Sequence, residues 1–258
     1  MTKSIGFKLL MLVGIYVLFL FSGAKIDQLL IENSSILKNI LQFSSSCILA
    51  YCSYFLVKTT NITEDKIKTS KNTKIWLIIF GIIMLLFLLI VINVPRNIKE
   101  IFNGDSNLFL SSFFVAGEAG IFEEFLVRVL GFSVFLEIFK SNKYSLVWAS
   151  ISSSLLFGVL HLSNLTSQSF DATIQQIFYA TVLGLCLAVI RIRFNGISYA
   201  VILHFLIDFH PTIAEGTSES SSWGSLLLIF MPIAIVSFIC LMQLNKDNNS
   251  TPLLGVHN

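Results

Sequence analysis

The sequence predicts an all-α protein, a polytopic bundle of about eight transmembrane helices. Hydrophobic residues make up 55% of its 258 residues and charged residues only 12%, against ~25% charged in ordinary soluble domains. The mean hydropathy of +0.81 agrees with this composition. Eight spans of about 20 residues use about 160 residues, which leaves short loops. The composition excludes a disordered chain, a basic nucleic-acid-binding domain and a typical cytosolic enzyme.

Three apolar segments open the chain, and we expect each of them to cross the membrane. The first covers about residues 7–24, and no A-x-A cleavage site follows it, so we expect a retained span rather than a signal peptide. The second, about 36–57, is diluted by serines. The third, about 75–94, has the clearest apolar run, IWLIIFGIIMLLFLLIVINV.

The fourth segment, about residues 107–139, is too long for one straight span. It contains Gly117, Gly120 and several acidic residues, and we expect a tilted or interrupted helix there. Four further segments follow, at about 144–162, 172–190, 196–213 and 223–243. The polar tail after Lys246 is expected to be disordered.

The distribution of basic residues predicts the orientation of these eight segments. With the N-terminus in the cytoplasm, twelve of the 17 Lys and Arg lie in cytoplasmic segments and four in outer segments. The remaining one, Arg128, lies inside a span. This asymmetry follows the positive-inside rule. It predicts a multi-pass protein of the cell membrane with both termini in the cytoplasm.

Ionisable residues inside the spans mark the candidate site, because a charge at the bilayer centre costs about 2.5–3.5 kcal/mol on insertion scales. They gather in the fourth, fifth and seventh segments, at Glu118, Glu123, Glu124, Arg128, His161, His204, Asp208 and His210. A buried polar network that only fixes helix packing is the alternative. It explains a single pair better than the whole set.

The spacing of these residues predicts which of them share a helix face. Glu124 and Arg128 are four residues apart and are expected to form an ion pair. His204 and Asp208 have the same spacing. Glu123 precedes Glu124 directly and points about 100° away from it. One carboxylate is therefore expected to hold Arg128 while the other faces elsewhere.

Two kinds of chemistry fit this set of side chains. A carboxylate in a cavity of low dielectric constant can act as a general base, and histidines can help to activate water or stabilise an oxyanion. The same Glu, His, His and Asp side chains are also candidate ligands of a divalent metal, with Zn favoured. The chain has neither HExxH nor GxSxG, which argues against zincin-type and serine hydrolase chemistry.

Three ordered motifs then reveal a family resemblance. Residues 123–128 (EEFLVR) match EExxxR, residues 157–161 (FGVLH) match FxxxH, and residues 204–208 (HFLID) match HxxxN/D. On separate spans, in this order, they resemble the CPBP family of CAAX proteases and bacteriocin-processing enzymes, also called Abi. The resemblance covers about residues 107–213. It suggests N-terminal spans in 1–106, a catalytic core in 107–213, and a last span with a polar cytoplasmic tail in 214–258.

The resemblance implies an intramembrane endopeptidase that acts on a membrane-associated or leader-bearing peptide or protein. It implies that Glu123 and His161 activate water and that His204, with Asp208, stabilises the oxyanion. Glu124, Arg128 and Phe157 are the implied supporting residues. The family has been described both as metalloproteases and as metal-free glutamate proteases. The metal candidates are therefore Glu123, His161, His204 and Asp208, and we favour the glutamate mechanism because a second clear carboxylate ligand is missing.

Two positions depart from the family pattern. Val129 stands where many members have Gly, and Asp208 stands where Asn is common. An ionised Asp cannot donate a hydrogen bond to an oxyanion, so Asp208 is expected instead to orient His204 or to bind a metal. His210 and Glu118 lie outside the motifs and are expected to serve packing or a span end.

Two rival functions use the same residues. A non-catalytic bacteriocin-immunity or peptide-binding protein of the same fold would keep the motifs without cutting a peptide. A proton- or ion-coupled transporter would use intramembrane Glu, His and Asp as a relay, but the chain has no inverted repeat. The expected partners are a peptide or membrane-protein substrate and the lipid bilayer, with no nucleic acid.

Overall fold

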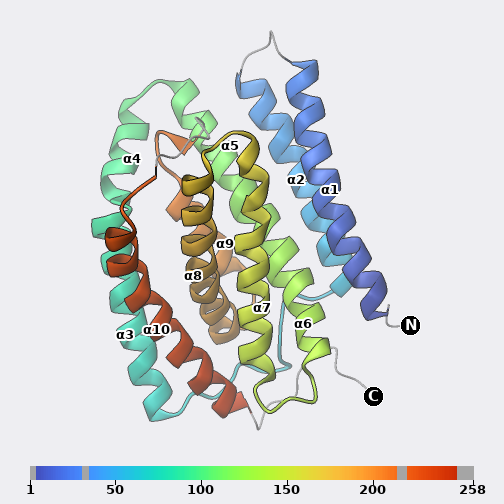
Figure 1. The fold of residues 1–258 in the computed structure, drawn as a ribbon, viewed down its shortest axis with the longest axis vertical. Helices are drawn as coiled ribbons and strands as arrows, with labels where there is room; N and C mark the ends of the chain where they lie inside the picture. The colour runs from blue at the N-terminus through green and yellow to red at the C-terminus, as the bar shows by residue number, and fades with distance from the viewer. Residues whose placement is uncertain (1–3, 31–34, 214–219, 249–258) are drawn as a thin grey trace.

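A computed structural model describes residues 4–30, 35–213 and 220–248, and most of these residues are helical (Figure 1). The α-helices are α1 (Ile5–Leu29), α2 (Ser35–Val57), α3 (Lys71–Leu86), α4 (Val94–Asn103), α5 (Ser106–Glu123), α6 (Phe132–Ile138), α7 (Ser145–Leu160), α8 (Phe170–Phe194), α9 (Ser198–Asp208) and α10 (Trp223–Asp247). Two π-helices, η1 (Phe87–Val91) and η2 (Glu124–Gly131), and a 3₁₀-helix, η3 (His161–Thr166), continue α3, α5 and α7. The predicted all-α fold is confirmed.

Polar side chains set the starts of the long helices. The side-chain oxygen of an N-cap residue accepts a hydrogen bond from a backbone N–H that has no partner within the helix. Ser4, Ser70, Asp105, Ser169 and Ser222 do this for α1, α3, α5, α8 and α10. These caps lie where apolar runs begin, at the change from polar to hydrophobic sequence.

The described residues contain the eight apolar segments that the sequence predicts. Six helical stretches are long and apolar enough to cross a membrane, namely α1, α2, α3 with η1, α7 with η3, α8 and α10. The path through α5, η2 and α6 and the shorter α9 supply the other two. The start of α1 and the end of α10 lie at the same end of the bundle (Figure 1), as an even number of crossings requires.

Two of the segments differ from straight spanning helices. The fourth is interrupted, as predicted, by the π-helix η2 between α5 and α6. The seventh, expected at about 196–213, forms a helix of only 11 residues, α9, which is about 16 Å long. This is about half of a ~30 Å hydrocarbon core. The helix ends at Asp208, so α9 itself covers only part of the membrane thickness and residues 209–213 continue the seventh segment without α-helix. The tail beyond residue 248 lies outside the described residues.

Small residues let α7 and α8 pack closely. Ser150, Ser153 and Ser154 are fully buried, and their hydroxyls donate hydrogen bonds to backbone carbonyls of α7 itself. A Cβ added to Gly184 of α8 would lie 2.9 Å from the Cβ of Ser154. A Cβ added to Gly158 would lie 2.7 Å from the Ile177 carbonyl oxygen. This contact fixes the end of α7 that carries the second motif.

Candidate active site

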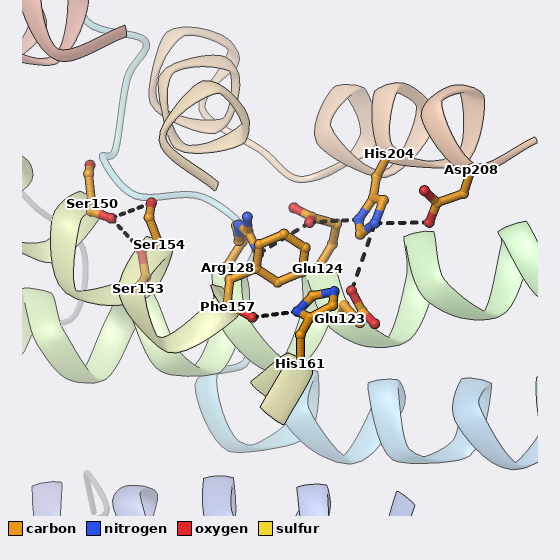
Figure 2. A network of polar contacts seen from close by, with 10 residues as sticks. All are labelled: Glu123, Glu124, Arg128, Ser150, Ser153, Ser154, Phe157, His161, His204 and Asp208. Atoms are coloured by element: carbon orange, nitrogen blue, oxygen red, sulfur yellow. Dashed lines mark hydrogen bonds and ion pairs between the residues drawn. The ribbon is translucent and has the colours of Figure 1, made fainter. Parts of the chain in front are cut away.

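Glu124 and Arg128 form the buried base of the candidate site (Figure 2). Both side chains are fully buried, and Arg128 Nη1 lies 3.4 Å from Glu124 Oε1. The guanidinium lies over the ring of Phe157, with its central carbon 4.0 Å from the ring centroid. The predicted ion pair is therefore present. Phe157 covers the cation on the side that Glu124 leaves open, as a cation–π contact allows.

Glu123 faces a cavity, whereas Glu124 faces the protein interior. Glu123 is the last residue of α5, and its side chain is 24% exposed, against 0% for Glu124. It lines a cavity of about 420 Å³ that His161, His204 and Asp208 also line. The predicted divergence of the two neighbouring carboxylates is thus observed. One of them supports the buried cation, and the other meets whatever enters the cavity.

His204 of α9 links the motifs to one another. Its Nδ1 lies 3.0 Å from Glu124 Oε1, and its Nε2 lies 3.2 Å from Asp208 Oδ2 and 3.8 Å from Glu123 Oε2 (Figure 2). Carboxylate oxygens accept hydrogen bonds, and only the doubly protonated imidazolium has a donor on both ring nitrogens. The surroundings of His204 therefore favour a cation at the wall of the cavity.

His161 is held by a backbone carbonyl group rather than by a carboxylate. It ends α7, and its Nδ1 lies 2.9 Å from the carbonyl oxygen of Phe157. A carbonyl can only accept, so Nδ1 donates this hydrogen bond and Nε2 is the ring nitrogen left for another partner. Figure 2 shows the ring beside Glu123. An imidazole and a carboxylate thus lie together at the cavity.

Phe157 explains why the second motif begins with an aromatic residue. Its ring meets the rings of His161 and His204 edge to face, with centroids 5.1 Å and 5.6 Å away. Its face carries Arg128. One buried aromatic side chain therefore packs against both imidazoles and the buried cation, and it fixes the distances among the three motifs.

A close approach of α5 and α9 brings the acids to His204. A Cβ added to Gly120 would lie 3.2 Å from both the carbonyl oxygen of Val201 and the amide nitrogen of Phe205. Gly120 stands one helical turn before Glu123 and Glu124. This contact with α9 was not predicted from the sequence, although the position of Gly120 one turn from the acids was a usable signal.

Other residues complete the cavity, and the sequence did not predict them all. Tyr16 of α1 lines it and donates a hydrogen bond from its hydroxyl to the carbonyl oxygen of Leu160, at 2.5 Å. His210, expected to have only a packing or span-end role, also lines the cavity. Glu118 is not among the lining residues and instead accepts a hydrogen bond from Ser46 of α2 at 3.2 Å.

The candidate metal ligands do not fit a metal ion as they stand. Among the described residues, no group of three or more His, Cys, Asp or Glu side chains is arranged to hold one. Asp208 and Glu123 already lie at His204 Nε2, at 3.2 Å and 3.8 Å, where a metal ion would have to bind that histidine. We therefore derive no step through zinc.

Comparison with known proteins identifies one family. Residues 105–210 match the family model described as Rce1-like, type II CAAX prenyl endopeptidase Rce1-like. This stretch contains all three motifs, and the match confirms the resemblance that they predict. No curated protein and no solved structure matched the chain.

Proposed function

We propose that this membrane protein is an intramembrane endopeptidase with Glu123 at its reacting centre. Residues 105–210 match the Rce1-like family of type II CAAX prenyl endopeptidases, which supports this proposal. The observation that supports this assignment most strongly is that the neighbouring carboxylates of Glu123 and Glu124 have different surroundings. Glu124 is sealed against Arg128, whereas Glu123 faces a cavity that His161 and His204 also line. A polar network that only fixed helix packing would not require an acid that faces a cavity.

The proposed reaction begins with a water molecule between Glu123 and His161. Glu123, aided by His161, takes a proton from this water as a general base. The hydroxide attacks the carbonyl carbon of the scissile peptide bond, and a tetrahedral oxyanion forms. The bond from carbon to nitrogen then breaks, and the proton held by Glu123 passes to the leaving amine.

His204 supplies the positive charge that this reaction needs. An imidazolium held in place before the reaction stabilises the oxyanion more than water would, because it does not have to reorient. Asp208 contacts the same nitrogen of His204, at 3.2 Å. An ionised Asp208 has no proton to donate, so we assign it the positioning of His204. The site is supported from its buried side by Glu124, Arg128 and Phe157.

The proposed setting is the cell membrane, with both termini in the cytoplasm and the catalytic core in residues 107–213. The substrate that we infer is a membrane-associated or leader-bearing peptide or protein. A site built within a bundle of spanning helices is reached most readily by a chain that already lies in or against the bilayer.

The test compares new peptide N-termini in the membranes of cells that make the wild-type protein or Glu123→Gln. Glutamine keeps the size of the side chain and removes the base. The matched control is Glu118→Gln, which changes a carboxylate on the same helix that is bonded to Ser46. We expect specific products to vanish in Glu123→Gln and to remain in Glu118→Gln. Identical products in all three strains would refute the endopeptidase and favour a bacteriocin-immunity or other peptide-binding role.

A further inference from the structure

The oxyanion of the proposed reaction needs a hydrogen-bond donor, and the third motif does not provide a free one. His204 has both ring nitrogens directed to carboxylates, Nδ1 to Glu124 at 3.0 Å and Nε2 to Asp208 at 3.2 Å. Its positive charge acts through space, but its protons are already shared with these acids. An ionised Asp208 has no proton to donate. A free donor therefore has to come from another part of the cavity wall.

α8 supplies one wall of the catalytic cavity. The residues of α8 that line it are Gln176, Tyr179, Ala180, Leu183 and Leu187. Their spacing places them on one face of the helix. Only Gln176 and Tyr179 among these five have side-chain donors. Gln176 lies beside η3, where its Oε1 accepts a hydrogen bond from Asn164, and Tyr179 follows it by almost one turn.

The hydroxyl of Tyr179 is free to donate a hydrogen bond. It has no hydrogen-bond partner among the described residues, whereas the hydroxyl of Tyr16, which lines the same cavity, donates to the carbonyl oxygen of Leu160. The ring of Tyr179 is held in place, because it stacks on Phe230 of α10 with centroids 5.7 Å apart. A fixed ring with an unbonded hydroxyl suits a preorganised donor, since no other bond has to break before it acts.

Tyr179 lies close to the residues of the second and third motifs. It lines the cavity together with His161 and Asp208, and its hydroxyl interacts electrostatically with Asp208. A Cβ added to Gly158, three residues before His161, would lie 2.7 Å from the carbonyl oxygen of Ile177. Ile177 is two residues before Tyr179. Tyr179 and His161 are therefore within about one helical turn of each other along the bundle.

We propose that the hydroxyl of Tyr179 donates a hydrogen bond to the oxyanion and is a further catalytic residue. This inference rests on the proposed endopeptidase function. When hydroxide attacks the scissile carbonyl, the C=O double bond becomes a C–O⁻ single bond. The phenol O–H donates to this oxygen and is not itself broken. The interaction strengthens as negative charge develops, so it lowers the barrier more than it tightens substrate binding.

The test removes the hydroxyl alone. Tyr179→Phe keeps the ring that stacks on Phe230, and the matched control is Tyr51→Phe, at a residue of α2 that is 64% exposed and does not line the catalytic cavity. The substrate is a peptide that spans a cleavage site lost in Glu123→Gln. We expect Tyr179→Phe to lower kcat about 100-fold with KM unchanged, because removal of one oxyanion donor costs about 100- to 1,000-fold in kcat. Tyr51→Phe should match the wild type.

Two further backgrounds separate a donor from a packing role. In Asp208→Asn, the amide oxygen still accepts from His204 and the amide nitrogen supplies a second donor. Tyr179→Phe should therefore cost less than about tenfold in that background, but still about 100-fold in Asp208→Ala.

Three outcomes overturn the inference. They are a wild-type kcat in Tyr179→Phe, an equal loss in the Asp208→Asn and Asp208→Ala backgrounds, and a loss that disappears in Asp208→Ala. The last would mean that the hydroxyl only positions Asp208. If wild type and Glu123→Gln already give identical products, it is the proposed function that fails.

Discussion

His204 is the residue through which the three motifs act on one another. It contacts Glu124 at one ring nitrogen and Asp208 and Glu123 at the other, and its ring packs against Phe157. A change at any of these neighbours therefore alters either the charge of the imidazole or its position. Substitutions of Asp208 separate the effect on charge from the effect on position, because this side chain can lose its charge and still keep its size.

Asp208→Asn should retain cleavage within about tenfold of wild type, whereas Asp208→Ala should lower kcat about 100-fold with little change in KM. Asparagine still offers an oxygen to His204 Nε2 at the same reach, but alanine leaves the ring free to move. A misplacement of about 1 Å can cost about 100-fold in rate. Steady-state cleavage of a product-derived peptide measures both constants. Equal losses in the two variants would show that the charge of Asp208 matters rather than its position.

Arg128→Ala should strongly destabilise the fold. Removing the guanidinium empties a fully buried site and leaves Glu124 with His204 as its remaining ion-pair partner. Breaking a buried pair in this way costs about 3–5 kcal/mol in the free energy of unfolding. Denaturant unfolding in detergent micelles, followed by tryptophan fluorescence, measures the loss.

The chain contains its own control for this prediction. Arg96 and Glu100 form an exposed pair with the same i,i+4 relation, 2.7 Å apart, and Arg96→Ala should leave the unfolding curve unchanged because surface pairs contribute little. Equal unfolding curves for Arg128→Ala and wild type would contradict the role given to burial.

At the residue scale, the sequence predicted contacts within one helix and missed those between helices. Glu124 with Arg128, and His204 with Asp208, follow from helical spacing alone. The contact of His204 with Glu124 joins residues 80 positions apart, and no local pattern determines it. Tyr16 was missed for the same reason, since it reaches the cavity from a helix that otherwise resembles a plain lipid-facing span.

Elements position the site through their irregularities. The fourth segment is helical to Glu123, becomes π-helical at Glu124, and returns to α-helix at Phe132. The sequence predicted an interruption there from length and glycines. It did not predict that α9 would stop at Asp208, because apolar residues continue beyond the helix end and a hydrophobic window measures composition rather than helix length.

Gly120→Ala should disturb the site through the packing of α5 on α9. The added methyl group would lie 3.2 Å from backbone atoms of Val201 and Phe205, so α9 must move by a few tenths of an ångström. We expect cleavage to fall about tenfold, mainly in kcat, because His204 moves relative to Glu123. Stability should fall by about 1 kcal/mol.

Gly81→Ala is the control for that change. Gly81 lies in α3, and a Cβ there would meet nothing within 4 Å. Cleavage kinetics and unfolding of both variants are measured together. If Gly120→Ala cleaved as fast as Gly81→Ala, the close approach of α5 and α9 would not govern the geometry of the site.

For the whole molecule, composition and charge were the most informative features of the sequence. The eight segments follow from apolar windows. The basic residues gather mainly at one of the two ends of the bundle. Lys58, Lys74 and Lys143 lie near one end of the bundle, where α2 ends and α3 and α7 begin, and Lys99 lies at the other, on α4. Apolar windows cannot predict how the segments pack around the catalytic cavity, because this packing depends on side-chain contacts between distant parts of the chain.

This grouping of charge leads to a prediction about orientation. Positive charge is retained on the cytoplasmic side, so the end of the bundle that carries Lys140 should face the cytoplasm and the end that carries Lys99 should face outward. Lys99→Cys and Lys140→Cys place single thiols at two exposed positions, in a chain whose four native cysteines are replaced by alanine. A membrane-impermeant maleimide should label Lys99→Cys in intact cells and Lys140→Cys only after permeabilisation. The opposite pattern would invert the topology and place η3, which lines the catalytic cavity, on the cytoplasmic side.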